Sequence, residues 1–155
     1  MILNNQKIIS PKIKIPHILK DKVKIFSNCN LNINEIQLFQ ISLQLVANYL
    51  NHKNFTLNDY YCLNIFFTEN GIISFHDESN KVNGMQIYMA IYKMKNLREK
   101  NMSTFSMFVY IEELAHYFLR ISDETKIKYK VIEIMKELIP SFSINDVKGW
   151  GLNGL

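Results

Sequence analysis

The chain has 155 residues, of which 48% are hydrophobic and 12% aromatic, and its formal net charge is +4. This composition excludes an intrinsically disordered chain and is sufficient for one folded domain with a sizeable core. No apolar run reaches the length of a membrane span, and the polar N-terminus does not resemble a signal peptide. We therefore expect a cytoplasmic protein without membrane contact, with Cys29 and Cys62 as isolated cysteines outside any CxxC pattern.

The positive charge is concentrated in the N-terminal segment. Residues 1–26 contain six lysines and one aspartate, which gives +5, whereas the twelve basic and thirteen acidic residues of 27–155 give −1. Lysine-rich residues 7–24 could therefore contact nucleic acid. The alternative is an edge strand protected by lysines. This alternative, which we favour, rests on the alternation of Lys12, Lys14, Lys22 and Lys24 with Ile13, Ile15, Val23 and Ile25.

The first predicted elements are an irregular basic segment, a helix and a small sheet. Residues 1–34 read as extended chain, and Asn34 is the expected N-cap of a helix that ends near Leu50. The polar residues of this helix recur at helical spacing and form one stripe: Gln37, Gln40, Gln44 and Asn48. Segments 60–67 and 72–75 flank Asn70-Gly71 and predict a hairpin, and 85–92 predicts a third strand at the sheet edge.

Two helices are predicted in the C-terminal half, after a charged connection at 93–102. The first begins with Ser103 or Thr104 as N-cap and ends at Leu119. The second begins at 122–124 and ends before Pro140. Its expected inner face is Ile127, Val131, Ile134 and Leu138. The class is α+β, with a domain at 35–140 and a loosely ordered, glycine-rich tail at 141–155.

Three ionisable residues interrupt the most apolar helix. Eleven of the fifteen residues from 105 to 119 are apolar or aromatic, and the exceptions include Glu112, Glu113 and His116. A helix that is apolar almost all round is normally buried, and buried carboxylates are costly unless they are paired, protonated or bound to a cation. Glu112 and Glu113 are four and three residues before His116, so both can contact it. This segment is the candidate functional site.

The segment Glu112-Glu113-Leu114-Ala115-His116 resembles the His-Glu-x-x-His motif of zincin metallopeptidases. In that family two histidines bind zinc and the glutamate activates the attacking water. The resemblance implies that His116 is the second histidine, that Glu113 is the general base, and that Glu112 replaces the first histidine as a metal ligand. It also implies the zincin order of elements over about residues 35–139.

The same resemblance implies a third metal ligand from the final helix. The candidates are Asp123, Glu124, Glu133 and Glu137, and the turn count favours Glu133. In the small gluzincin branch the ligand lies near the start of this helix, where this chain has Lys126 and Lys128. Because two of three ligand positions are altered, we expect a catalytically inactive homologue that holds no zinc.

Such a homologue would bind a protein or peptide along the edge strand at 85–92. One alternative is a non-enzymatic accessory protein of a mobile element or low-GC bacterium, whose basic arm contacts DNA or a partner. Another is an active metallopeptidase that uses zinc at a Glu/His site. The purely structural interpretation is an ordinary Glu113–His116 pair, with Glu112 facing solvent or pairing with Arg120 or Lys128.

Overall fold

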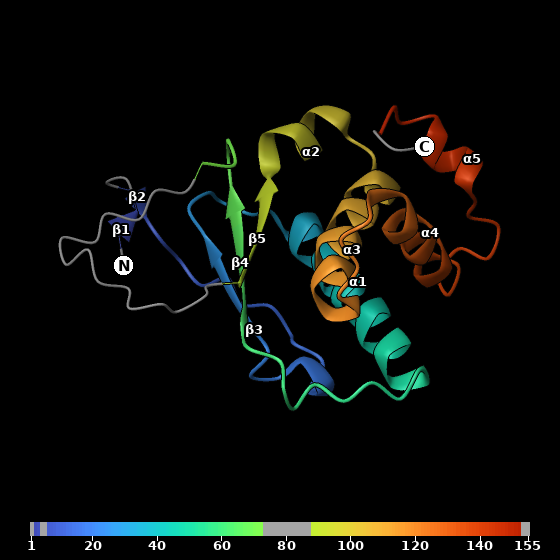
Figure 1. The fold of residues 1–155 in the computed structure, drawn as a ribbon. Helices are drawn as coiled ribbons and strands as arrows, with labels where there is room; N and C mark the ends of the chain where they lie inside the picture. The colour runs from blue at the N-terminus through green and yellow to red at the C-terminus, as the bar shows by residue number, and fades with distance from the viewer. Residues whose placement is uncertain (1, 4–5, 73–87, 153–155) are drawn as a thin grey trace.

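A parallel three-stranded sheet carries helices on one face in the computed structural model, which describes residues 2–3, 6–72 and 88–152 (Figure 1). The strand order is β3 (Val23–Ser27), β4 (Leu63–Thr68), β5 (Tyr88–Lys93), and both pairings are parallel. This mixture of helices with a small sheet confirms the predicted α+β class. A separate two-stranded ribbon joins β1 (Ile2–Leu3) to β2 (Gln6–Lys7), and η1 (His17–Leu19) is a short 3-10 turn.

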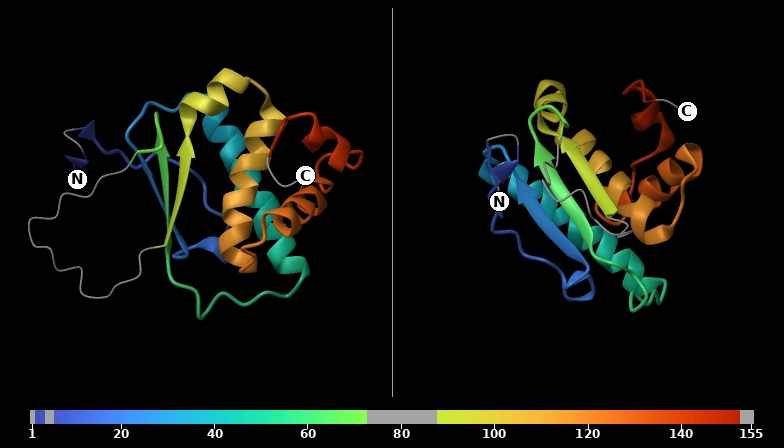
Figure 2. Two further views of the ribbon diagram at one scale, coloured as in Figure 1. Left: turned by 45° about the horizontal axis from the view of Figure 1, so that its top comes forward. Right: turned by 60° about the vertical axis from the view of Figure 1, so that its left-hand side comes forward.

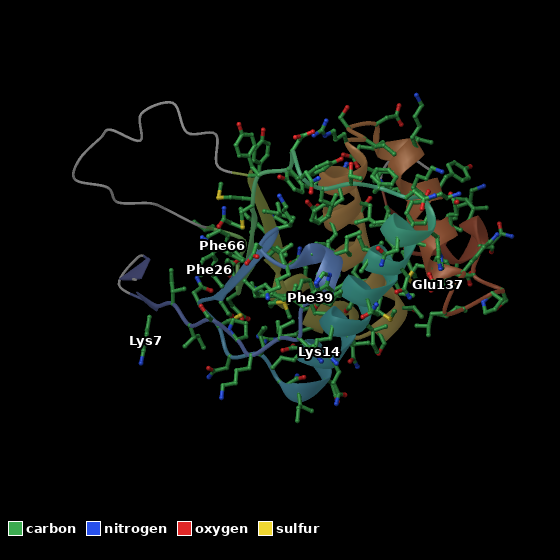
Figure 3. The ribbon with its side chains drawn as sticks, turned by 90° about the horizontal axis from the view of Figure 1, so that it is seen from below. Lys7, Lys14, Phe26, Phe39, Phe66 and Glu137 are labelled. Atoms are coloured by element: carbon green, nitrogen blue, oxygen red, sulfur yellow. The ribbon has the colours of Figure 1, made fainter. Side chains whose placement is uncertain are left out.

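The two faces of the sheet differ because side chains alternate along each strand. Ile25, Ile65 and Ala90 stand in register and are buried on the helical face. Figure 3 shows Phe39 of α1 on that side, whereas Phe26 and Phe66 stack on the opposite face, with ring centroids 5.1 Å apart. The apolar residues buried on the helical face of the strands are Val23, Ile25, Leu63, Ile65, Phe67, Ala90 and Tyr92.

The strands differ from the expectation in one respect. Segments 60–67 and 85–92 correspond to β4 and β5, and β5 lies at one edge of the described sheet. The predicted strand at 72–75 lies outside the described residues, apart from Ile72. The remaining strand of this sheet is β3, from the basic N-terminal segment, and it lies at the other edge with Lys24 exposed and Ile25 buried. The second half of the alternation, Val23 to Ile25, thus lies in an edge strand, whereas Lys12 to Ile15 lie outside the strands.

Helix α1 (Ile33–His52) connects β3 to β4 and forms a β-α-β unit with them. It begins two residues earlier than predicted, because Asn32 and Glu35 form a capping box in which each side chain accepts a hydrogen bond from the other's backbone N–H, both at 2.9 Å. Gln37 and Gln44 of the predicted polar stripe are exposed.

Helix α3 (Ser103–Leu119) is the central helix and packs against both α1 and α4 (Figure 2). Its N-cap is Met102 rather than Ser103 or Thr104. The connection before it contains a helix that was not predicted, α2 (Met94–Lys100), which buries Met94 and Leu97. No helix in the described part of the chain is long and apolar enough to cross a membrane.

The C-terminal region contributes to the core. Helix α4 (Glu124–Met135) buries Ile127, Val131 and Ile134 as predicted, but Leu138 lies beyond its end and is 49% exposed. The expected loose tail contains α5 (Ile144–Lys148) and is packed against the domain. Its buried or partly buried apolar residues include Phe142, Val147 and Trp150.

Candidate functional site

The turn between α3 and α4 brings the charged residues of the two helices together. Arg120 ends α3 in the left-handed conformation, with φ of 54°, which reverses the chain direction. The Asp123 side chain then caps α4 by accepting a hydrogen bond of 2.8 Å from the Lys126 backbone N–H. Because the connection is short, Glu124 lies beside His116.

Glu112 and His116 of α3 face Lys128 and Glu124 of α4 across the packed helices. Lys128 Nζ lies 3.2 Å from Glu112 Oε1 and 3.3 Å from Glu124 Oε2. His116 Nε2 lies 3.7 Å from Glu124 Oε1. Each helix contributes two residues one turn apart, so acidic and basic groups alternate around the cluster. We call these four residues the interhelical charge cluster.

Lys128 is the most buried member of the interhelical charge cluster, with a side chain only 5% exposed. Its ammonium donates hydrogen bonds to the Glu124 carbonyl oxygen at 3.2 Å and to the Glu124 carboxylate. Glu112 Oε1 is within ion-pair distance but accepts no hydrogen bond from the described residues. The amine therefore has two hydrogen-bond acceptors and a second negative charge beside it, which offsets the cost of burying a cation.

The backbone orients the imidazole of His116. Its Nδ1 lies 2.6 Å from the carbonyl oxygen of Ile121, in the α3–α4 turn. A carbonyl oxygen can only accept, so Nδ1 carries a proton and Nε2 is the ring nitrogen directed toward Glu124. An Nδ1–H bond to a backbone carbonyl is also how metal-binding histidines are commonly oriented.

The cluster contains a set of possible metal ligands with a lysine ammonium beside it. One ligand atom from each of Glu112, His116 and Glu124 lies within 4.8 Å of the others. However, the ammonium of Lys128 contacts both carboxylates. Two unit charges 4 Å apart repel by about 4 kcal/mol at an effective dielectric constant of about 20, and a divalent ion doubles that repulsion. With Lys128 in this position, a metal ion held by these two carboxylates would lie close to a second positive charge.

Glu133, the expected third ligand, does not join this group. Its carboxylate lies 2.8 Å from Lys130 Nζ and 3.6 Å from Lys53 Nζ, toward the other end of α4. Nine residues separate it from Glu124, which is about 13 Å along a helix. The tight turn through Arg120 instead places the first residue of α4, Glu124, opposite His116.

Glu113 faces a different environment from Glu112, its neighbour in the sequence. It lines a cleft of about 550 Å³ together with His116, Tyr117 and Arg120. Burial raises the pKa of the Glu113 carboxyl above its usual range, the positive charge of His116 opposes the shift, and Glu112 and Glu124 add to it. The expected general base thus lies on the cleft wall, outside the ligand set of the cluster.

Tyrosine rings form much of the remaining cleft wall. Tyr61 stacks on Tyr88, with centroids 5.9 Å apart, and Tyr88 contacts Tyr117 at 5.2 Å. The Arg120 guanidinium lies over the ring of Tyr60, 4.4 Å from its centroid. These residues come from the loop before β4, from β5, from α3 and from the turn after it. The cleft therefore combines aromatic surface with acidic and basic groups.

The cleft lies beside the edge strand of the described sheet. Tyr88 and Met89, the first two residues of β5, line it, and β5 pairs only with β4 among the described strands. Met89 is 41% exposed. The site thus offers both a hollow for side chains and, next to it, the edge of a strand.

Sequence reasoning found part of this arrangement. It selected Glu112, Glu113 and His116. The purely structural alternative left Glu112 facing solvent or pairing with Arg120 or Lys128, and the structure places Lys128 Nζ 3.2 Å from Glu112 Oε1. It missed the cleft tyrosines and named Arg120 only as a possible partner of Glu112, because the cleft residues come from four separate segments and no local pattern links them. Comparisons with protein-family models, curated proteins and solved structures found no match.

Proposed function

We propose that this protein binds an extended peptide segment of a partner in the cleft and along β5, and that it does not hydrolyse it. In this proposal the chain is a zincin-like domain without catalytic activity. The observation that carries it is the position of the cleft, with Glu113 and His116 on its wall and an edge strand at its side. An extended peptide can add to such an edge through main-chain hydrogen bonds, while pockets beside it select side chains.

The chemistry of the site supports binding rather than hydrolysis. A zincin-like reaction needs a metal ion to polarise the peptide carbonyl and the attacking water. Lys128 lies against the carboxylates that would hold that ion. In this proposal Glu113 does not act as a general base, and its carboxyl is a polar group on the cleft wall that receives the peptide.

The binding test is a selection from a random peptide library displayed on phage, followed by affinity measurement with synthetic peptides. The matched variants are Tyr61→Ala in the cleft and Tyr129→Ala on α4, since both tyrosines are exposed, at 72% and 55%. We expect Tyr61→Ala to weaken binding about tenfold or more, as loss of an aromatic contact at an interface does, and Tyr129→Ala to leave it unchanged.

Mass spectrometry of the bound peptides decides whether hydrolysis occurs. We expect intact peptides after incubation with the protein and added zinc. Cleavage that disappears in His116→Ala would establish the second candidate, an active metallopeptidase. The close approach of the ligand atoms of Glu112, His116 and Glu124 is the observation in favour of that candidate.

Contact of residues 7–24 with nucleic acid stays a prediction from the charge distribution. Lys22 is occupied, because it donates hydrogen bonds to the carbonyl oxygens of Tyr60 and Asn58, at 2.9 and 3.4 Å. Lys12, Lys14 and Lys24 are exposed. Fluorescence anisotropy with a labelled DNA duplex at low salt tests it, since phosphate contacts weaken steeply as salt rises.

A further inference from the structure

We infer that the ammonium group of Lys128 is the resident cation of the interhelical charge cluster, and that it occupies the position in which Glu112, His116 and Glu124 would otherwise bind a divalent metal ion. This inference does not depend on peptide binding. It concerns the chemistry of the ligand set alone.

The first support is the chemistry of the donors. Two carboxylates and one imidazole nitrogen are a ligand set that zinc accepts, and catalytic zinc sites commonly have three protein ligands. The three ligand atoms lie within 4.8 Å of one another. Their side chains come from two packed helices joined by a short turn, so the backbone already holds them together.

The second support is the position of the amine. Lys128 is 5% exposed and reaches from α4 toward Glu112 on α3. Its Nζ is nearly equidistant from Glu112 Oε1 and Glu124 Oε2, at 3.2 and 3.3 Å. A buried lysine normally needs nearby negative charge, which these two carboxylates supply. The lysine in turn supplies one positive charge at a position where a divalent metal ion would supply two.

The third support is that the two carboxylates differ in their hydrogen bonds. The Glu124 carboxylate accepts one hydrogen bond from the ammonium, but Glu112 Oε1 is buried and accepts none from the described residues. A buried carboxylate oxygen with a charge beside it but no hydrogen bond has an unused lone pair. If the amine were removed, its positive charge would be missing beside Glu112 Oε1, the Glu124 carboxylate and His116 Nε2.

The test compares the wild type with Lys128→Ala, Lys128→Arg and Lys128→Ala/His116→Ala. Each purified protein is dialysed against zinc chloride, its zinc content is determined by elemental analysis, and its affinity is measured by competition with a chromophoric chelator. We expect no zinc above background in the wild type and Lys128→Arg, but about one equivalent in Lys128→Ala. Affinity should fall at least about tenfold when His116 is also replaced.

Thermal unfolding gives a readout that is independent of zinc content. Zinc should raise the melting temperature of Lys128→Ala but not that of the wild type, because a ligand stabilises the state that binds it. If Lys128→Ala is unfolded without metal, zinc should restore its helical circular dichroism. Stoichiometric zinc in the wild type that is lost in His116→Ala would overturn the inference. Failure of zinc to bind, stabilise or refold Lys128→Ala would also overturn it.

Discussion

Glu112 and Glu113 are adjacent in the sequence but have different surroundings. Glu112 points between the helices toward Lys128, whereas Glu113 lines the cleft. Successive helical residues are rotated by about 100°, so adjacent carboxylates on one helix can serve two faces. Glu112 has the buried ammonium of Lys128 beside it. Glu113 has no such cation beside it in the described structure, and burial raises the pKa of its carboxyl.

Replacing Glu113 with Gln should stabilise the protein at neutral and alkaline pH. Because the carboxyl pKa is raised in the folded state, its favourable contribution is complete below the unfolded-state value of about 4.5 and is lost as pH rises through the folded-state pKa. Glutamine imitates the protonated carboxyl and does not lose this contribution. Urea unfolding at several pH values should show an advantage for Glu113→Gln at pH 8 that closes toward pH 4.

The matched control is Glu99→Gln, since Glu99 is exposed on α2. The difference in unfolding free energy between Glu99→Gln and the wild type should stay nearly constant between pH 4 and pH 8. A Glu113→Gln advantage that stays constant across the pH range, or that grows toward acid, would contradict the argument.

The position of the third acidic residue could not be predicted from spacing alone. Turn counting favoured Glu133, but the choice depends on where α4 begins relative to α3. That is determined by the left-handed conformation of Arg120, a residue type that rarely adopts it. Glu112 and His116 were predictable because their separation on one helix is local information, whereas the partnership with Glu124 depends on tertiary structure.

At the scale of elements, the α3–α4 turn makes a direct prediction about Arg120. Arg120→Gly and Arg120→Ala both remove the guanidinium from the Tyr60 ring, so they differ only in backbone preference. Glycine adopts a φ of 54° without strain, but alanine does not. We expect Arg120→Gly to be more stable than Arg120→Ala by about 1 kcal/mol in urea unfolding. Equal stability of the two variants would mean that the turn does not require this conformation.

Arg98 connects α2 to α1 and to two loops, so its replacement tests how strongly these contacts stabilise the position of α2. Its guanidinium donates to both carboxylate oxygens of Glu35, at 2.7 and 3.1 Å, to Glu69 at 2.8 Å and to the Asn30 carbonyl at 2.7 Å. Lysine keeps the charge but cannot form the paired geometry. We expect Arg98→Lys to lower the unfolding free energy by about 1–2 kcal/mol.

A double-mutant cycle with Glu35→Gln checks this assignment. The two substitutions act on the same hydrogen bonds, so their combined cost should be smaller than the sum of the single costs. Strict additivity would show that Arg98 and Glu35 do not share the interaction.

The elements themselves were predictable to different degrees. Helix α1 has a long polar stripe and a local cap, so its existence follows from periodicity, and only its first two residues were missed. Helix α2 has seven residues, too few for a clear pattern, and its signal was the spacing of Met94 and Leu97. The parallel pairing of β3 with β4 could not be predicted, because it joins strands separated by α1.

At the scale of the whole molecule, the C-terminal region closes one end of the core. Phe142 is 4% exposed, and Trp150 contacts it as well as Phe105 and Phe108 of α3, with centroid distances of 5.4–5.9 Å. The sequence predicted a loose tail because glycines surround Trp150. Its aromatic residues instead pack against Phe105 and Phe108 of α3.

Phe142→Ala should therefore destabilise the protein by about 3–5 kcal/mol, as large core truncations do. Trp150 is the only tryptophan, so its fluorescence reports on this region during urea unfolding. Leu138→Ala is the control, since Leu138 is 49% exposed and should cost little. A small effect of Phe142→Ala, with unchanged Trp150 emission, would mean that the C-terminal region is not part of the cooperative unit.

The amine between Glu112 and Glu124 is covalently part of the chain. A metal ion in a comparable place must be acquired after synthesis, can be exchanged for another metal, and is lost when its free concentration falls. A lysine, in contrast, is built into every chain during translation, so each molecule carries one amine at this position and it cannot be exchanged for another cation. The electrostatic balance between α3 and α4 is therefore inherited with the gene and independent of the metal supply around the protein.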